Sequence, residues 1–187
     1  MHVPDAANTF HKNPKDTSLH KQYNHAVQCS ATRHWKKLTN STKATKEELE
    51  GWKIRQGIPS FDKEMNGETN PYELGLADTI NLDKGCYLGQ EAMAKFFRSK
   101  SLKYQLRYWE AYGENDNFKI GKNFFNTDKN GGYKKNVGVV TSSIRVNDNF
   151  FNGLALIKKS FLDQDFCFSE NGDSITIKKP ISFTNPF

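Results

Sequence analysis

Cysteine is scarce in this sequence, and no two cysteines are close together. Cys29, Cys86 and Cys167 are the only three, and none forms a Cys-x-x-Cys pair. Disulfide-stapled domains need several paired cysteines, and a four-cysteine metal site needs one more than the chain has. The count therefore argues against both, and we assign no residue to a metal. It suits a reducing compartment.

Long apolar runs are also absent. Hydrophobic residues make up 36% of the 187 residues, and no run approaches the roughly 20 residues that span a bilayer. Met1–Asp5 lacks the basic-then-apolar pattern of a signal peptide. We therefore predict a cytoplasmic protein without membrane contact. The 14 Phe residues favour a core over part of the length, because each buries a large area.

Charge is unevenly distributed along the chain. Residues 1–46 carry eight Lys/Arg against two Asp/Glu, residues 47–97 carry five against 10, and residues 98–187 carry 14 against nine. Two basic regions therefore flank an acidic middle. Basic regions can bind polyanions such as nucleic acid, and they also occur as ordinary solvated surface. A weak contact with tRNA is one expectation from this pattern.

Residues 1–45 are polar and basic, and we predict a poorly ordered or remnant segment there. Four of the five histidines lie in residues 1–27, at spacings that match neither a helical pair nor a zinc finger. The first element that we predict to be ordered starts at Thr45. Thr45 and Glu48 have the pattern of a capping box, which predicts a helix that ends at Gly57. A strand-like stretch over Thr79–Leu82 and a helix over residues 90–97 follow.

After Ser99 the pattern changes to short strands. Alternation over residues 102–109 predicts a half-buried strand, and further strands are expected over residues 137–142, 153–157, 166–168 and 174–177. Glu170–Asp173 is typical of a hairpin turn. Short strands without intervening helices indicate a small antiparallel barrel. We predict an α+β protein divided into residues 1–45, 46–98 and 99–187, with the last boundary near residues 98–101.

The segment 84–91, Lys-Gly-Cys-Tyr-Leu-Gly-Gln-Glu, holds the candidate site. Cys86 lies between two glycines and just ahead of a predicted helix, and Lys84 lies two residues upstream. A helix N-terminus and a nearby lysine both favour the thiolate, which predicts a reactive thiol. The alternative is a small apolar residue that fills a corner between elements. The local chemistry leaves both interpretations open.

This eight-residue segment resembles the signature of the YgfZ-type proteins, which are relatives of the glycine cleavage T-protein, an aminomethyltransferase. Three flanking segments resemble that family as well: Trp52–Pro59, Asn70–Leu76 and the strand Gly138–Ser142. The resemblance covers roughly residues 46–180. It implies a partial T-protein-like central domain in residues 46–98, followed by a C-terminal antiparallel barrel.

The resemblance also implies a function. The family is implicated in assembly or repair of iron–sulfur clusters and in tRNA modification that depends on them. Carried over by position, Cys86 and Lys84 become the catalytic residues, and the motif or ligand-binding residues are Gly85, Tyr87, Gly89, Gln90 and Glu91. Tetrahydrofolate is the implied cofactor. Family members carry a longer N-terminal folate-binding region than residues 1–45 could form. The alternatives are a truncated relative, one piece of a split gene, or a remnant for which a separate chain supplies that region.

Two other functions remain open on the sequence. One is an enzyme, an aminomethyl (one-carbon) transferase of the T-protein type. The other is a non-catalytic barrel that binds RNA or protein, in which the aromatic and basic strand Lys103–Tyr112 stacks on bases. The same alternation is explained by one strand face in a barrel core. The implied partners are iron–sulfur proteins or their assembly factors.

Overall fold

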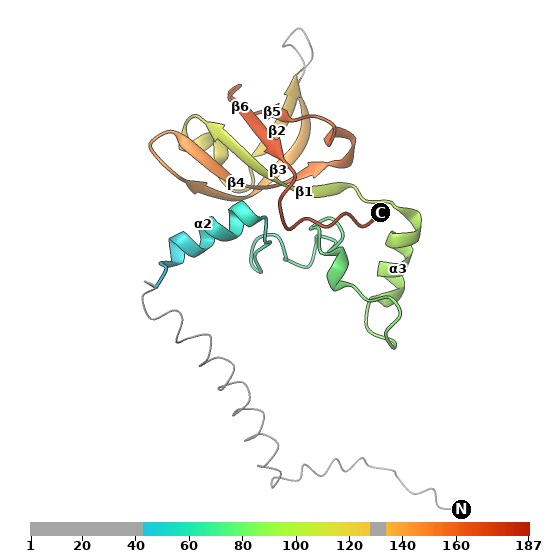
Figure 1. Ribbon diagram of the computed structural model, residues 1–187. Helices are drawn as coiled ribbons and strands as arrows, with labels where there is room; N and C mark the ends of the chain where they lie inside the picture. Colours follow the sequence, from blue (N-terminus) through green and yellow to red (C-terminus); the bar gives the residue numbers. More distant parts are fainter. Residues whose placement is uncertain (1–42, 128–133) are drawn as a thin grey trace, which may run out of the picture. The chain divides into compact units, whose positions relative to one another are not determined.

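The described part of the chain begins with a helix whose start and end are both set by residues close by in the sequence. The computed structural model describes residues 43–127 and 134–187 (Figure 1). Helix α2 (Lys46–Gln56) starts with the predicted capping box: the Thr45 hydroxyl accepts from the Glu48 N–H at 3.1 Å, and the Glu48 carboxylate accepts from the Thr45 N–H at 2.8 Å. Gly57 ends the helix in the left-handed conformation, with φ of 78°. The predicted helix is confirmed.

Six antiparallel strands close into a barrel in the order β1-β4-β3-β2-β5-β6, which confirms the predicted fold class. The strands are β1 (Tyr104–Tyr112), β2 (Asn123–Thr127), β3 (Lys134–Arg145), β4 (Phe150–Lys158), β5 (Phe166–Phe168) and β6 (Ser174–Lys178). Helix α3 (Gln90–Ser99) precedes β1, and the 3-10 turns are η1 (Ala77–Thr79), η2 (Asn115–Phe118) and η3 (Lys159–Phe161). Thr45–Phe187 form one compact unit. None of the helices in the described ranges is long and apolar enough to cross a membrane.

An aromatic core built around Trp109 fills the barrel. The Trp109 ring lies 5.4 Å from Phe118 and meets Phe124 edge-on at 5.6 Å, between ring centroids. Its indole N–H donates to the Leu154 carbonyl at 3.1 Å, so the one polar atom of the ring is satisfied. Cys167 is fully buried in the same core. Its side of the strand could not be assigned from the sequence.

A second apolar cluster lies outside the barrel, on the other face of β1. This outer cluster consists of Ile54, Leu74, Leu106, Tyr108, Leu154 and Phe183. The prediction of a half-buried strand over residues 102–109 is wrong in this respect, because β1 is buried on both faces. Trp109 faces the core, while Leu106 and Tyr108 lie under α2, residues 70–76 and the C-terminal tail. Alternation reports one buried face and carries no information on a second layer.

Backbone hydrogen bonds tie this outer layer to β1 and to the C-terminal tail. The Leu106 N–H donates to the Glu73 carbonyl at 2.7 Å, and the Thr184 N–H donates to the Gly75 carbonyl at 3.1 Å. Residues 70–76 therefore lie between β1 and the tail, on the barrel surface. Two of the three flanking segments of the sequence resemblance, residues 52–59 and 70–76, meet at the outer cluster.

The predicted hairpin at residues 170–173 is confirmed. Strands β5 and β6 pair in antiparallel register, with Phe168 opposite Ser174. The Ser169 N–H donates to the Asp173 carbonyl at 2.9 Å, and Gly172 adopts a φ of 96° that favours glycine. Strand β6 alternates buried and exposed residues cleanly. This turn and strand were predictable because the signals are local.

Candidate functional site

The approach to the candidate loop is a turn, and the strand predicted over Thr79–Leu82 is wrong. Residues 77–79 form the 3-10 turn η1, and the chain then folds around Asn81. The Asn81 side-chain oxygen accepts from the N–H groups of Asp83 at 2.9 Å and Lys84 at 3.0 Å. An Asn side chain that binds the backbone ahead of it competes with a strand. The result is a fixed entry into the motif.

Gln90 closes the loop from its other end. Its side-chain amide donates to the Leu82 carbonyl at 2.7 Å and to the Lys84 carbonyl at 3.3 Å. Gly89, the N-cap of α3, adopts a φ of 88°, and its carbonyl accepts from the Met93 N–H at 3.0 Å. Gln90, predicted as a motif residue, therefore joins the first turn of α3 to the segment before Cys86. Gly89 supplies the left-handed backbone that begins the helix.

Cys86 lies exposed on this tied loop. Gly85 beside it is exposed too, and a Cβ added there would meet nothing within 4 Å. The interpretation of Cys86 as a buried corner residue is thus wrong. The described structure contains one other cysteine, Cys167, and burial raises the pKa of its thiol. Of these two thiols, only Cys86 is placed to meet a partner.

Lys84 and Tyr87 contact each other on the same loop. The Lys84 ammonium lies 4.7 Å from the centre of the Tyr87 ring, a distance typical of a cation–π contact. Tyr87 is half-buried, and its hydroxyl is buried without a hydrogen-bond partner among the described residues. A buried hydroxyl left unpaired costs free energy, which a bridging water would relieve. Glu91 is exposed in the first turn of α3.

A cavity of about 550 Å³ lies beside the loop. Its walls combine two aromatic rings with carboxylates and small apolar groups: Tyr72, Ala77, Asp78, Ile80, Asn81, Leu82, Asp83 and Phe97. Burial, with a smaller contribution from Tyr87, raises the pKa of Tyr72. Tyr72 and Phe97 were not singled out in the sequence, because they lie on separate segments that only the fold brings together.

Two proteins share similarity with parts of this chain. One is a chloroplastic protein of Arabidopsis thaliana whose name describes a transferase, 41% identical over 54 residues, or 29% of this chain and 12% of that protein. The other is the tRNA-modifying protein YgfZ of Buchnera aphidicola, 37% identical over 70 residues, or 36% of this chain and 22% of that protein. The matches thus span less than a quarter of either relative. No family model matches the chain.

The chemistry open to the site follows from a single exposed thiol. Such a thiol can act as a nucleophile, a redox group or one ligand to a soft metal. Holding a complete iron–sulfur cluster takes about four thiolates. Within residues 43–127 and 134–187, no three His, Cys, Asp or Glu side chains are grouped so as to hold a metal ion. The five histidines lie outside the described residues.

The two described cysteines should differ sharply in reactivity. In a Cys29→Ser background, which removes the thiol outside the described residues, we expect Cys86 to react rapidly with a disulfide reagent, because it is exposed. Cys167 should react slower by roughly a thousandfold or more, because it is fully buried and its exposure requires unfolding. Stopped-flow absorbance in native buffer and in urea measures both. Adding Cys86→Ser should remove the fast phase alone; a surviving fast phase would contradict the assignment.

Proposed function

We propose that this protein is a YgfZ-type accessory factor that serves iron–sulfur proteins or their assembly factors in the cytoplasm, in support of tRNA modification. The observation that carries the proposal is the placement of Cys86, exposed on a loop that Asn81 and Gln90 tie at both ends. The name and partial identity of the Buchnera relative support it. Cys86 gives one thiolate to a cluster in transit, and the client or assembly factor supplies the other ligands.

We assign tetrahydrofolate to the cavity beside the loop as the cofactor of this function. Phe97 offers an exposed face for a flat ring system, backed by the buried Tyr72, and Asp78 and Asp83 offer acceptors for its N–H groups. Phe97 is 43% exposed, so these residues form one side of such a site. The other side would come from a separate chain. When bound, the cofactor would supply one-carbon chemistry, and the residues of this chain would orient its ring.

Loss of the Cys86 thiol should abolish function. We expect Cys86→Ser to fail to restore the activity of iron–sulfur enzymes in a strain that lacks the full-length relative, because serine replaces a soft ligand with a hard one. Leu88→Ser is the matched control: it changes another exposed residue of the same loop and should restore activity like the unaltered chain. Circular dichroism verifies that both variants fold. Full rescue by Cys86→Ser would contradict the proposal.

A second candidate function is aminomethyl transfer to tetrahydrofolate. The name of the Arabidopsis relative, which describes a transferase, favours it. It predicts that the purified chain, together with the chain that completes the folate site, forms methylene-tetrahydrofolate from an aminomethyl donor, with ammonia and the donor's carrier group released. Absence of turnover in that assay, with tetrahydrofolate binding intact, would eliminate this candidate and leave the accessory role.

A further inference from the structure

An aromatic cluster at the C-terminal end of α3 is partly open to solvent. Its rings are Tyr72, Phe97 and Phe187, whose centroids lie 5.8 to 6.5 Å apart. Tyr72 is 2% exposed, whereas Phe97 and Phe187 are 43% and 44% exposed. Each exposed ring thus contacts a buried one, which limits the number of orientations that it can adopt.

Helix α3 adds to this open surface. Its apolar residues gather on one side, yet none of its ten residues is buried. Phe96 is 36% exposed in the same turn as Phe97. Amphipathic helices normally bury their apolar side, so the uncovered side of α3 is available for a binding partner.

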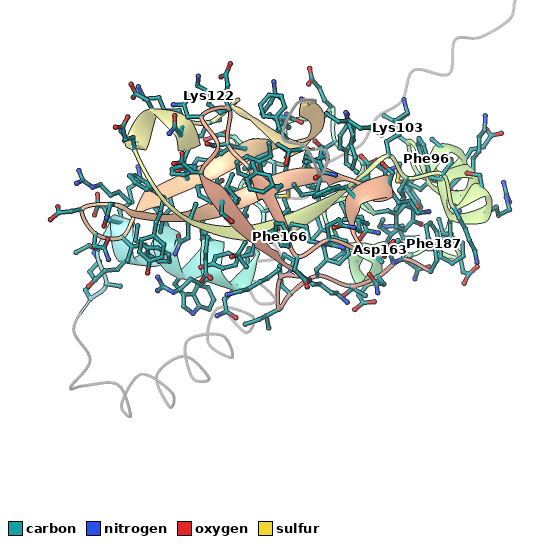
Figure 2. All side chains as sticks on the ribbon, turned by 90° about the horizontal axis from the view of Figure 1, so that it is seen from above. Phe96, Lys103, Lys122, Asp163, Phe166 and Phe187 are labelled. Atoms are coloured by element: carbon teal, nitrogen blue, oxygen red, sulfur yellow. The ribbon has the colours of Figure 1, made fainter. Side chains whose placement is uncertain are left out.

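Three lysines surround the cluster. The Lys100 and Lys159 ammonium groups lie 5.9 and 6.0 Å from the centre of the Phe187 ring, and Lys159 also donates to the Lys100 carbonyl at 3.1 Å. Lys103 follows on the same segment and is exposed (Figure 2). None of the three forms an ion pair within the described ranges. The Glu73 carboxylate, on the segment that packs along β1, accepts from the backbone N–H groups of Lys103 and Tyr104.

We propose that the aromatic cluster and these three lysines bind single-stranded RNA. Exposed rings beside unpaired cations suit unstacked bases joined by phosphates. Protein-docking surfaces, by contrast, are depleted of lysine at their centre, and here two lysines lie over Phe187, one of the two exposed rings of the cluster. The strand considered for stacking on sequence grounds, residues 103–112, has Trp109 buried in the core. The structure moves the candidate stacking surface to α3 and the C-terminal tail.

The proposed RNA surface borders the candidate site. Tyr72 and Phe97 belong to the aromatic cluster and also line the cavity beside the Cys86 loop. A base stacked on Phe97 would therefore lie at the edge of that cavity. The inference rests on the proposed function only in the choice of RNA over DNA as the nucleic acid.

Fluorescence anisotropy with a labelled single-stranded RNA of about 15 nucleotides and its duplex tests the proposal. We expect the single strand to bind more tightly than the duplex, with a slope of log K against log salt of about −2, because three lysines contact phosphates. Phe97→Leu should weaken binding roughly 5- to 100-fold, since it keeps the apolar bulk and removes the stacking face. Lys100→Ala and Lys159→Ala should each reduce the slope by about 0.7.

Matched controls come from the barrel. Phe166→Leu alters a ring that is 53% exposed on β5, and Lys122→Ala removes a lysine paired with Glu170; Figure 2 shows both residues away from Phe96 and Phe187. Both variants should bind RNA like the unaltered protein. Absence of affinity at low salt, equal affinity for duplex and single strand, or an unchanged affinity of Phe97→Leu would each overturn the proposal. In the first case the surface would be assigned to a protein partner.

The Cys86→Ser variant separates this proposal from the proposed function. It should bind the RNA with unchanged affinity, because Cys86 is not part of the aromatic cluster. If Cys86→Ser fails to rescue and the unaltered protein does not bind the RNA, the RNA proposal is overturned and the proposed function stands. Full rescue by Cys86→Ser, with RNA binding still sensitive to Phe97→Leu, would overturn the function and leave the RNA proposal.

Discussion

Replacing Gly153 with alanine should lower the free energy of unfolding by about 4 kcal/mol or more, a large share of the stability of a domain this size. Gly153 lies in β4, opposite Trp109 on one side and Ser143 on the other. A Cβ at this position would be 1.8 Å from the Ser142 carbonyl oxygen and 2.7 Å from the Trp109 ring. Neither the backbone oxygen nor the packed indole can move away without opening the barrel.

The irregular pairing of β3 explains why the backbone approaches Gly153 so closely. The register shifts between Val140 and Ser142, so Thr141 is an extra residue in that strand. A bulge bends its strand, and the bend brings the Ser142 carbonyl toward Gly153. Glycine at this position also leaves room for the Trp109 indole, the centre of the barrel core.

Urea and thermal unfolding measure the effect of Gly153→Ala, with an expected fall in Tm of roughly 10 °C or more. Gly85→Ala is the matched control. Its added Cβ meets nothing within 4 Å and its φ is not positive, so stability should stay the same or rise slightly. A change of less than about 1 kcal/mol for Gly153→Ala would show that the strands can separate there at little cost, and would contradict the tight barrel.

The elements that the sequence predicted well are those with local causes. Thr45 and Glu48 cap α2 through bonds three residues apart, and the β5–β6 hairpin turns through Ser169, Gly172 and Asp173. Each pattern holds its cause within a few residues. The motif at residues 84–91 was also recognisable, because its glycines and cysteine are contiguous.

Prediction failed where the cause was distant or competing. The Thr79–Leu82 stretch has a β-like composition, yet the Asn81 side chain binds its own backbone and makes a turn. Strand β2, with Phe124 in the core, was not predicted. The two buried faces of β1 depend on Phe183, far along the chain. The cavity likewise needs Tyr72 and Phe97 to meet, which no local pattern encodes.

Phe183→Ala should lower the free energy of unfolding by about 3–5 kcal/mol, the second largest effect that we expect. Phe183 is 4% exposed in the outer cluster, and its ring packs directly on Gly75, where a Cβ would lie 2.4 Å away. The Arg107 guanidinium lies 5.1 Å from the ring centre. Removing the ring leaves a cavity and uncovers that buried cation. Phe187→Ala, in the same tail but 44% exposed, is the control and should cost less than about 1 kcal/mol.

A double-mutant cycle between Phe183 and Gly75 tests whether their contact, rather than the tail in general, stabilises the outer layer. Gly75 has a φ of 77°. Gly75→Ala should therefore lower the free energy of unfolding by about 1–2 kcal/mol through the left-handed backbone, and further through the clash with the Phe183 ring. In a Phe183→Ala background only the backbone cost remains. The double variant should therefore be more stable than the sum of the two changes by about 1–3 kcal/mol. Strict additivity would contradict the packing of Phe183 on Gly75, and with it the anchoring of residues 70–76, which carry Tyr72 to the edge of the candidate site.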